Sequence, residues 1–121
     1  WIISEFDKIS KECNNCLEVS YLRNVVKGDP DTRIKEDTEI VSVIAIQRGT
    51  KYPNRYIIMS GDIDSRVSDV LNSVDDSPGA NDNATGMAGA IEAARVLSKY
   101  QLESSVVYVG LSGEEQGLYG G

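Results

Sequence analysis

The sequence predicts an α/β domain in which a helix joins two parallel β-strands. Apolar, β-branched runs over residues 55–60 and 105–112 are typical of buried strands. Between them, residues 84–100 repeat apolar side chains at helical spacing, with Met87 and Ile91 on the same face. A strand, a helix and a second strand in this order form a βαβ unit, and we expect its crossover to be right-handed.

The other elements are predicted from the same kinds of pattern. Residues 1–13 have the apolar spacing of an amphipathic helix, and residues 17–26 alternate as a strand does. Residues 38–47 form a β-branched run with little polar relief, which predicts a strand covered on both faces. Loops are expected over residues 48–54 and 61–83. The second loop is too long for a tight connection, which indicates a functional role.

Composition limits the classes of function that this chain can have. Its 121 residues suit one domain with a modest core. With 12 basic and 19 acidic side chains, the net charge of −7 argues against a general nucleic-acid binder. The absence of histidine excludes a Ser-His-Asp or Cys-His enzyme within these residues. No apolar run approaches the length of about 20 residues that a membrane-spanning helix needs.

Acidic side chains gather at the ends of the two predicted parallel strands. Asp62 and Asp64 follow the first strand, and Glu114 and Glu115 follow the second. Asp82 stands just before the connecting helix, at the same edge. Ligands of open α/β sheets bind beyond the carboxyl ends of parallel strands, so these carboxylates are expected to converge. Because like charges at close range are costly without a cation, the sequence favours a cation site over a solvated acidic rim.

Three segments resemble motifs of the M28 zinc aminopeptidases. They are residues 61–65 (GDIDS), residues 78–86 (PGANDNATG) and residues 113–118 (GEEQGL). The spacing between them is similar too, so that the resemblance covers residues 38–121. It implies a partial three-layer α/β/α domain with a mixed sheet, as in zinc-dependent exopeptidases. It also implies a metal-dependent aminopeptidase, in which a metal-activated water hydrolyses N-terminal peptide bonds of peptides or proteins.

The resemblance further implies roles for single residues. Asp82 corresponds to a carboxylate that bridges two zinc ions, and Glu115 to a terminal ligand of one of them. Glu114 corresponds to the general base that acts on the water. Asp64 corresponds to a carboxylate that orients the first metal ligand, and Asp62 stands in the position of that ligand.

Asp62 departs from the family, which has histidine at this position. A carboxylate can bind zinc, but an all-oxygen ligand set also suits Mn²⁺ or Mg²⁺. The expected cofactor is therefore one or two zinc ions, with Mn²⁺ or Mg²⁺ as alternatives. The family also has two later ligands, an aspartate and a histidine, downstream of residue 121. We therefore expect residues 1–121 to be the N-terminal part of a single peptidase domain, cut at both ends and inactive alone.

Two other functions stay open at this point. A glutaminyl-cyclase-like acyltransferase has a similar fold with a single zinc ion, which the missing histidine would suit. A non-catalytic relative could keep the fold as an interaction module. The second alternative is disfavoured, because Glu114 remains beside Glu115 in a chain that also keeps Asp82.

Cys13 and Cys16 are the only cysteines, and they stand where the first predicted helix ends. A redox CxxC begins a helix instead, so redox catalysis is disfavoured. The pair forms either a short structural disulfide or two free thiols. A disulfide would suit an exported protein, and we expect a secreted or periplasmic location.

Overall fold

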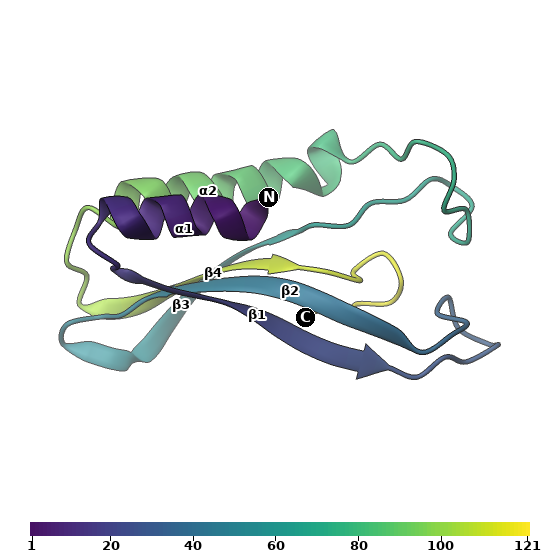
Figure 1. Cartoon of the computed structure of the whole chain (residues 1–121), viewed down its shortest axis with the longest axis horizontal. Coiled ribbons are helices and arrows are strands. Elements are labelled where there is room, and N and C mark those ends of the chain that lie inside the picture. The colour runs from purple at the N-terminus through teal and green to yellow at the C-terminus, as the bar shows by residue number, and fades with distance from the viewer.

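A four-stranded mixed sheet with both helices on one face forms the framework of the molecule (Figure 1). The computed structural model describes residues 1–121. The elements in chain order are α1 (Ile2–Glu12), β1 (Leu17–Val26), β2 (Thr38–Gln47), β3 (Tyr52–Asp62), a short irregular turn η1 (Ala80–Ala84), α2 (Thr85–Leu97) and β4 (Ser104–Leu111). Neither helix has both the length and the apolar character that crossing a bilayer requires.

The sheet has the strand order β1-β2-β4-β3. Strands β3 and β4 run parallel, joined by α2, and the other neighbours are antiparallel. This arrangement confirms the predicted α/β class, the mixed sheet and the βαβ unit. In the parallel pair Asp62 lies opposite Leu111, so β3 and β4 end at the same edge of the sheet.

Two element boundaries differ from the prediction. Strand β3 begins at Tyr52, inside the segment predicted as a loop. It contains Pro53, which an edge strand tolerates because the missing N–H faces no partner, and its register shifts between Tyr52 and Tyr56. Helix α2 ends at Leu97, three residues earlier than predicted, and the side chain of Gln47 binds the carbonyl oxygens of Leu97 and of Tyr100 just beyond the helix.

The core lies between the helices and the sheet. It contains Phe6 and Ile9 from α1 and the small residues Ala90 and Ala94 from α2, which let that helix approach the strands closely. The opposite face carries no helix of this chain, and the third layer is not formed by these residues. On that face β2 is buried at Ile40 and Ser42 but only half-buried at Ile44 and Ile46.

Gln47 is a buried polar residue that ties α2 to the sheet. It is only 4% exposed. Its Nε2 donates to the carbonyl oxygens of Leu97 at 3.0 Å and Tyr100 at 2.9 Å, and its Oε1 accepts from the Tyr108 hydroxyl at 3.0 Å. Burial raises the pKa of Tyr108 to about 12. One side chain therefore binds three polar groups, of which only the Leu97 carbonyl oxygen has a further partner, the N–H of Tyr100.

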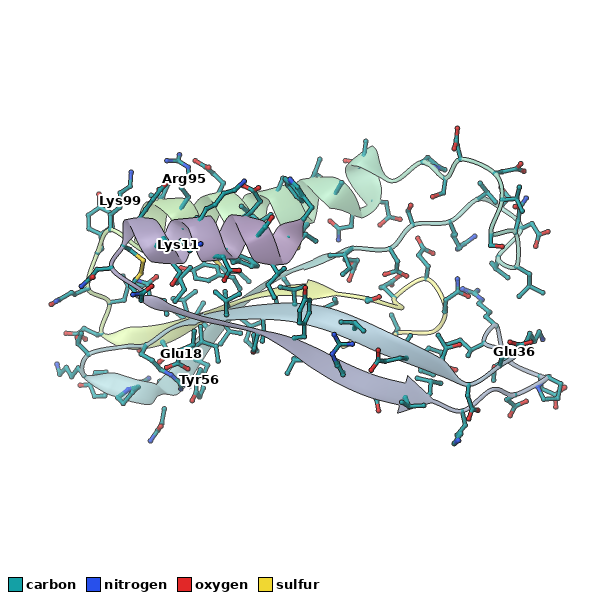
Figure 2. All side chains as sticks on the ribbon, viewed as in Figure 1. Lys11, Glu18, Glu36, Tyr56, Arg95 and Lys99 are labelled. Atoms are coloured by element: carbon teal, nitrogen blue, oxygen red, sulfur yellow. A yellow bond between two sulfur atoms is a disulfide. The ribbon has the colours of Figure 1, made fainter.

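Arg48 connects strands at the end of the sheet opposite the acidic edge. Arg48 donates to the Glu18 carboxylate, with Nη2 2.7 Å from Oε2, and to the Tyr56 hydroxyl at 3.1 Å. These hydrogen bonds lower the pKa of Glu18. Figure 2 shows Glu18 and Tyr56 together at that end of the molecule, far from the loops that follow β3 and β4.

Cys13 and Cys16 form a disulfide between the end of α1 and the start of β1. Of the two states that the sequence left open, the structure therefore has the bonded one. Asn14 and Asn15, the two residues between the cysteines, both have positive φ, a conformation that asparagine tolerates better than most residues.

Replacing Gln47 with leucine should destabilise the protein by about 2–3 kcal/mol, because three hydrogen bonds are lost and the buried Tyr108 hydroxyl is left without a partner. Urea unfolding followed by circular dichroism measures this difference. Gln101→Leu is the control, since Gln101 is exposed, and it should change stability by no more than about 0.5 kcal/mol. Equal stability of the two variants would contradict the assigned role of Gln47.

Candidate functional site

The predicted acidic residues lie at the edge of the sheet where β3 and β4 end. Asp62, Asp64, Asp82 and Glu115 all line one cavity of about 980 Å³. The cavity lies beside the N-terminal end of α2, whose residue Met87 forms part of its apolar wall. The structure thus brings four of the five predicted carboxylates to a single cavity.

Asp64 binds the main chain of the loop that follows β4. Its Oδ1 accepts from the N–H of Glu114 at 3.2 Å, and its Oδ2 accepts from the N–H of Glu115 at 3.1 Å. The family resemblance implied that Asp64 orients the ligand at position 62. In this structure the hydrogen bonds of Asp64 instead fix the backbone that presents Glu114 and Glu115.

Asn83 is the residue that holds Asp62. Its Nδ2 donates to Asp62 Oδ2 at 2.9 Å, and its Oδ1 accepts from the N–H of Gly86 at 3.0 Å in the first turn of α2. A Cβ atom at position 86 would lie 2.0 Å from the Oδ1 of Asn83, so the position requires glycine. Sequence analysis did not single out Asn83, although its position next to Asp82 was an available signal.

Two arginines that sequence analysis missed bind Glu115. The Nε of Arg66 lies 2.6 Å from Glu115 Oε2 in a shielded ion pair. A guanidinium nitrogen of Arg33, in the β1–β2 loop, donates to the carbonyl oxygen of Glu115. Neither arginine has a sequence signal that points to residue 115, because Arg33 lies 82 residues and Arg66 49 residues before it in the chain.

Glu114 has a pKa above its ordinary value. Partial burial is the main cause, and the negative charges of its neighbours add to it. These neighbours are Asp62, Glu115, Asp64 and Asp82. A carboxylate with a raised pKa is better matched to accepting and returning a proton near neutral pH.

The cavity-lining carboxylates are oxygen ligands of the kind that divalent cations bind, and they share one cavity. They do not form a complete ligand set. Oxygen ligands are what hard divalent ions prefer, and zinc also accepts carboxylates. No three His, Cys, Asp or Glu side chains of the chain come together as a metal-binding group. Asp62 is instead paired with Asn83, and Glu115 with Arg66.

Comparison with known proteins identifies the family. Residues 42–121 match the family model described as peptidase family M28. The chain belongs to this family. The match confirms the resemblance seen in the three sequence segments, and it includes every candidate residue of the site.

Curated relatives of this M28 chain are fungal proteins. It is 46% identical over 123 residues to a probable zinc metalloprotease of Pyrenophora teres f. teres (strain 0-1), a match that covers 99% of this chain and 24% of the relative. A probable zinc metalloprotease of Leptosphaeria maculans is 39% identical, with 99% and 27% covered. The M28 chain therefore spans about a quarter of the length of the curated relatives it matches.

Solved structures support the same fold. The aminopeptidase from Aneurinibacillus sp. strain AM-1 is 32% identical with a TM-score of 0.53, and the match covers 70% of this M28 chain and 20% of that one. The glutaminyl cyclase of Porphyromonas gingivalis has a TM-score of 0.69 at 20% identity, covering 99% and 40%. The second likeness concerns the fold alone.

Replacing Asp64 with asparagine should loosen the main chain at Glu114 and Glu115. An amide offers one acceptor oxygen where the carboxylate offers two, and its N–H₂ group would face a donor. Amide hydrogen exchange at these two residues should speed up by about tenfold or more. Asp76→Asn is the control, because Asp76 is exposed on the loop before the site, and it should leave both rates unchanged. Unchanged rates in Asp64→Asn would show that the two hydrogen bonds do not hold the loop.

Proposed function

We propose that this M28 chain forms part of the active site of a metal-dependent aminopeptidase. The observation that supports it most is the anchoring by Asp64 of Glu114, the candidate base, and of its neighbour Glu115, a candidate ligand. Glu115 lines the acidic cavity and Glu114 does not. The names of the relatives point to zinc metalloproteases. The aminopeptidase at 32% identity supports action at N-termini.

Asp62, Asp82 and Glu115 are the residues that would hold the metal. Zinc is favoured by the names of the relatives, and the all-oxygen set leaves Mn²⁺ or Mg²⁺ as alternatives. A divalent ion at this position would supply a Lewis acid that polarises the scissile carbonyl and lowers the pKa of water. Asn83 and Asp64 keep Asp62 and the backbone of Glu115 in place through the hydrogen bonds described above.

Glu114 is the proposed general base. It accepts the proton of the attacking water as the new C–O bond forms. It then returns that proton to the amine nitrogen as the C–N bond breaks, so the free carboxylate is regenerated. The raised pKa of Glu114 supports this role, because the protonated form is stabilised by burial and by the surrounding negative charge.

The cavity suits the free amino terminus of a peptide. Its carboxylates attract an ammonium group, and the same cavity has apolar walls that include Ile2, Ile63 and Met87. A peptide or protein N-terminus combines these two features in one ligand. The disulfide between Cys13 and Cys16 supports an oxidising location, so we propose that the protein is exported.

A glutaminyl-cyclase-like acyltransferase is the second candidate. It is favoured by the fold likeness to the Porphyromonas gingivalis glutaminyl cyclase, which covers 99% of this chain. Incubation with a peptide that begins with glutamine separates the two functions. An aminopeptidase releases free glutamine, whereas a cyclase releases ammonia and leaves the peptide bonds intact.

In a protein with the length of the relatives, Glu114→Gln should lower kcat by about 10²-fold or more at unchanged metal content. The amide cannot accept the proton of the water, but it leaves Asp62, Asp82 and Glu115 intact. Release of the first residue from short peptides, together with metal analysis, measures both quantities.

Glu103→Gln is the control, because the Glu103 carboxylate pairs with Lys51 on an exposed surface. This variant should keep its turnover. A Glu114→Gln enzyme with near-normal turnover would overturn the assigned base, and an inactive parent protein that binds zinc would favour a non-catalytic module.

A further inference from the structure

Arg66 is the only basic side chain that lines the cavity. Its Nε lies 2.6 Å from Oε2 of Glu115, and its Nη1 donates to the carbonyl oxygen of Val67 at 3.2 Å. The second contact holds the guanidinium against its own loop. Arg66 therefore points at a candidate metal ligand from a fixed position.

The Arg66–Glu115 pair is the most shielded of the seven ion pairs in the chain. The Glu115 side chain is 15% exposed and the Arg66 side chain 35%, whereas every other pair has at least one partner more than half exposed. Shielding from water strengthens the attraction between opposite charges. This pair should therefore persist in solution better than the surface pairs do.

The main chain of Glu115 is held independently of its side chain. Asp64 accepts its N–H at 3.1 Å, and Arg33 donates to its carbonyl oxygen. Breaking the contact with Arg66 would free the carboxylate without releasing the backbone. The Glu115 side chain can thus change partner while the residue stays at the cavity.

The negative charge of the cavity accounts for the position of the Arg66 guanidinium. Asp62, Asp64 and Asp82 line the same cavity as Glu115, and their mutual repulsion is reduced by a nearby positive charge. Arg33 also lies close, but its guanidinium binds the main-chain carbonyl oxygen of Glu115, whereas Figure 2 shows Lys11, Arg95 and Lys99 at the opposite end of the helix layer. Arg66 and a divalent ion would therefore neutralise the same carboxylates.

We propose that Arg66 is a built-in counter-ion of Glu115 that competes with the metal, so that metal loading requires the Arg66–Glu115 pair to break. This inference rests on the proposed function, which makes Glu115 a metal ligand. It has a consequence that a purely structural role lacks. Removing Arg66 should lower the stability of the metal-free protein and raise its affinity for metal at the same time.

The test compares zinc binding by a protein with the length of the relatives and by its Arg66→Gln variant, using isothermal titration calorimetry with ZnCl₂. The variant should bind zinc about three- to tenfold more tightly, the range expected for a pair between fully exposed and fully buried. It should also unfold at a lower urea concentration. Arg55→Gln is the matched control, because Arg55 is exposed and only stacks over Tyr52, and it should change the affinity by less than about twofold.

A double-mutant cycle and a spectroscopic measurement exclude a general charge effect. In a Glu115→Gln background, Arg66→Gln should no longer tighten zinc binding, because the competed ligand is gone. In ¹⁵N-labelled protein, the Nε–Hε resonance of Arg66 should be protected without metal, and adding ZnCl₂ should shift it and abolish the protection.

Zinc affinity that is equal or weaker in Arg66→Gln, with binding retained in the parent protein, would overturn the inference and leave the proposed function standing. If neither the parent protein nor Arg66→Gln bound zinc at millimolar concentration, both would fail.

Discussion

Parallel pairing of β3 with β4 is the constraint on which the site depends. The register places Asp62 opposite Leu111, so the two strands end together and their following loops leave the sheet at one edge. Asp64 then joins these loops by accepting both N–H groups at the start of the second. Asn83 joins the first loop to α2. A different strand pairing would separate all the candidate residues.

Much of this framework could be predicted because it depends on local periodicity. Buried β-branched runs and the small-residue face of α2 predict the βαβ unit, and the unit alone predicts where Asp62, Asp82 and Glu115 meet. Arg33 and Arg66 could not be predicted, because irregular loops with no repeating pattern bring them to Glu115. The hydrogen bonds of Asp64 depend on the backbone of a loop 50 residues away, which no side-chain pattern describes.

Repulsion between the carboxylates at this edge of the sheet is offset by hydrogen-bond donors of the same chain. Partial burial, followed by the charge of the neighbouring carboxylates, raises the pKa of Glu114. The carboxylates around one cavity would also destabilise the fold if their repulsion were uncompensated. The structure compensates with donors that the chain already has: main-chain N–H groups for Asp64, an amide for Asp62 and a guanidinium for Glu115. These donors hold the carboxylates in place around the cavity before any cation is bound.

The central claim is that the carboxylates at the ends of β3 and β4 form a metal site. Anomalous diffraction at the zinc edge, from crystals soaked in ZnCl₂, tests it most directly. We predict an ordered peak in the cavity, in contact with Asp62, Asp82 or Glu115, with Glu115 turned away from Arg66. Ordered zinc only at exposed carboxylates elsewhere, with none in the cavity at the same concentration, would contradict the account.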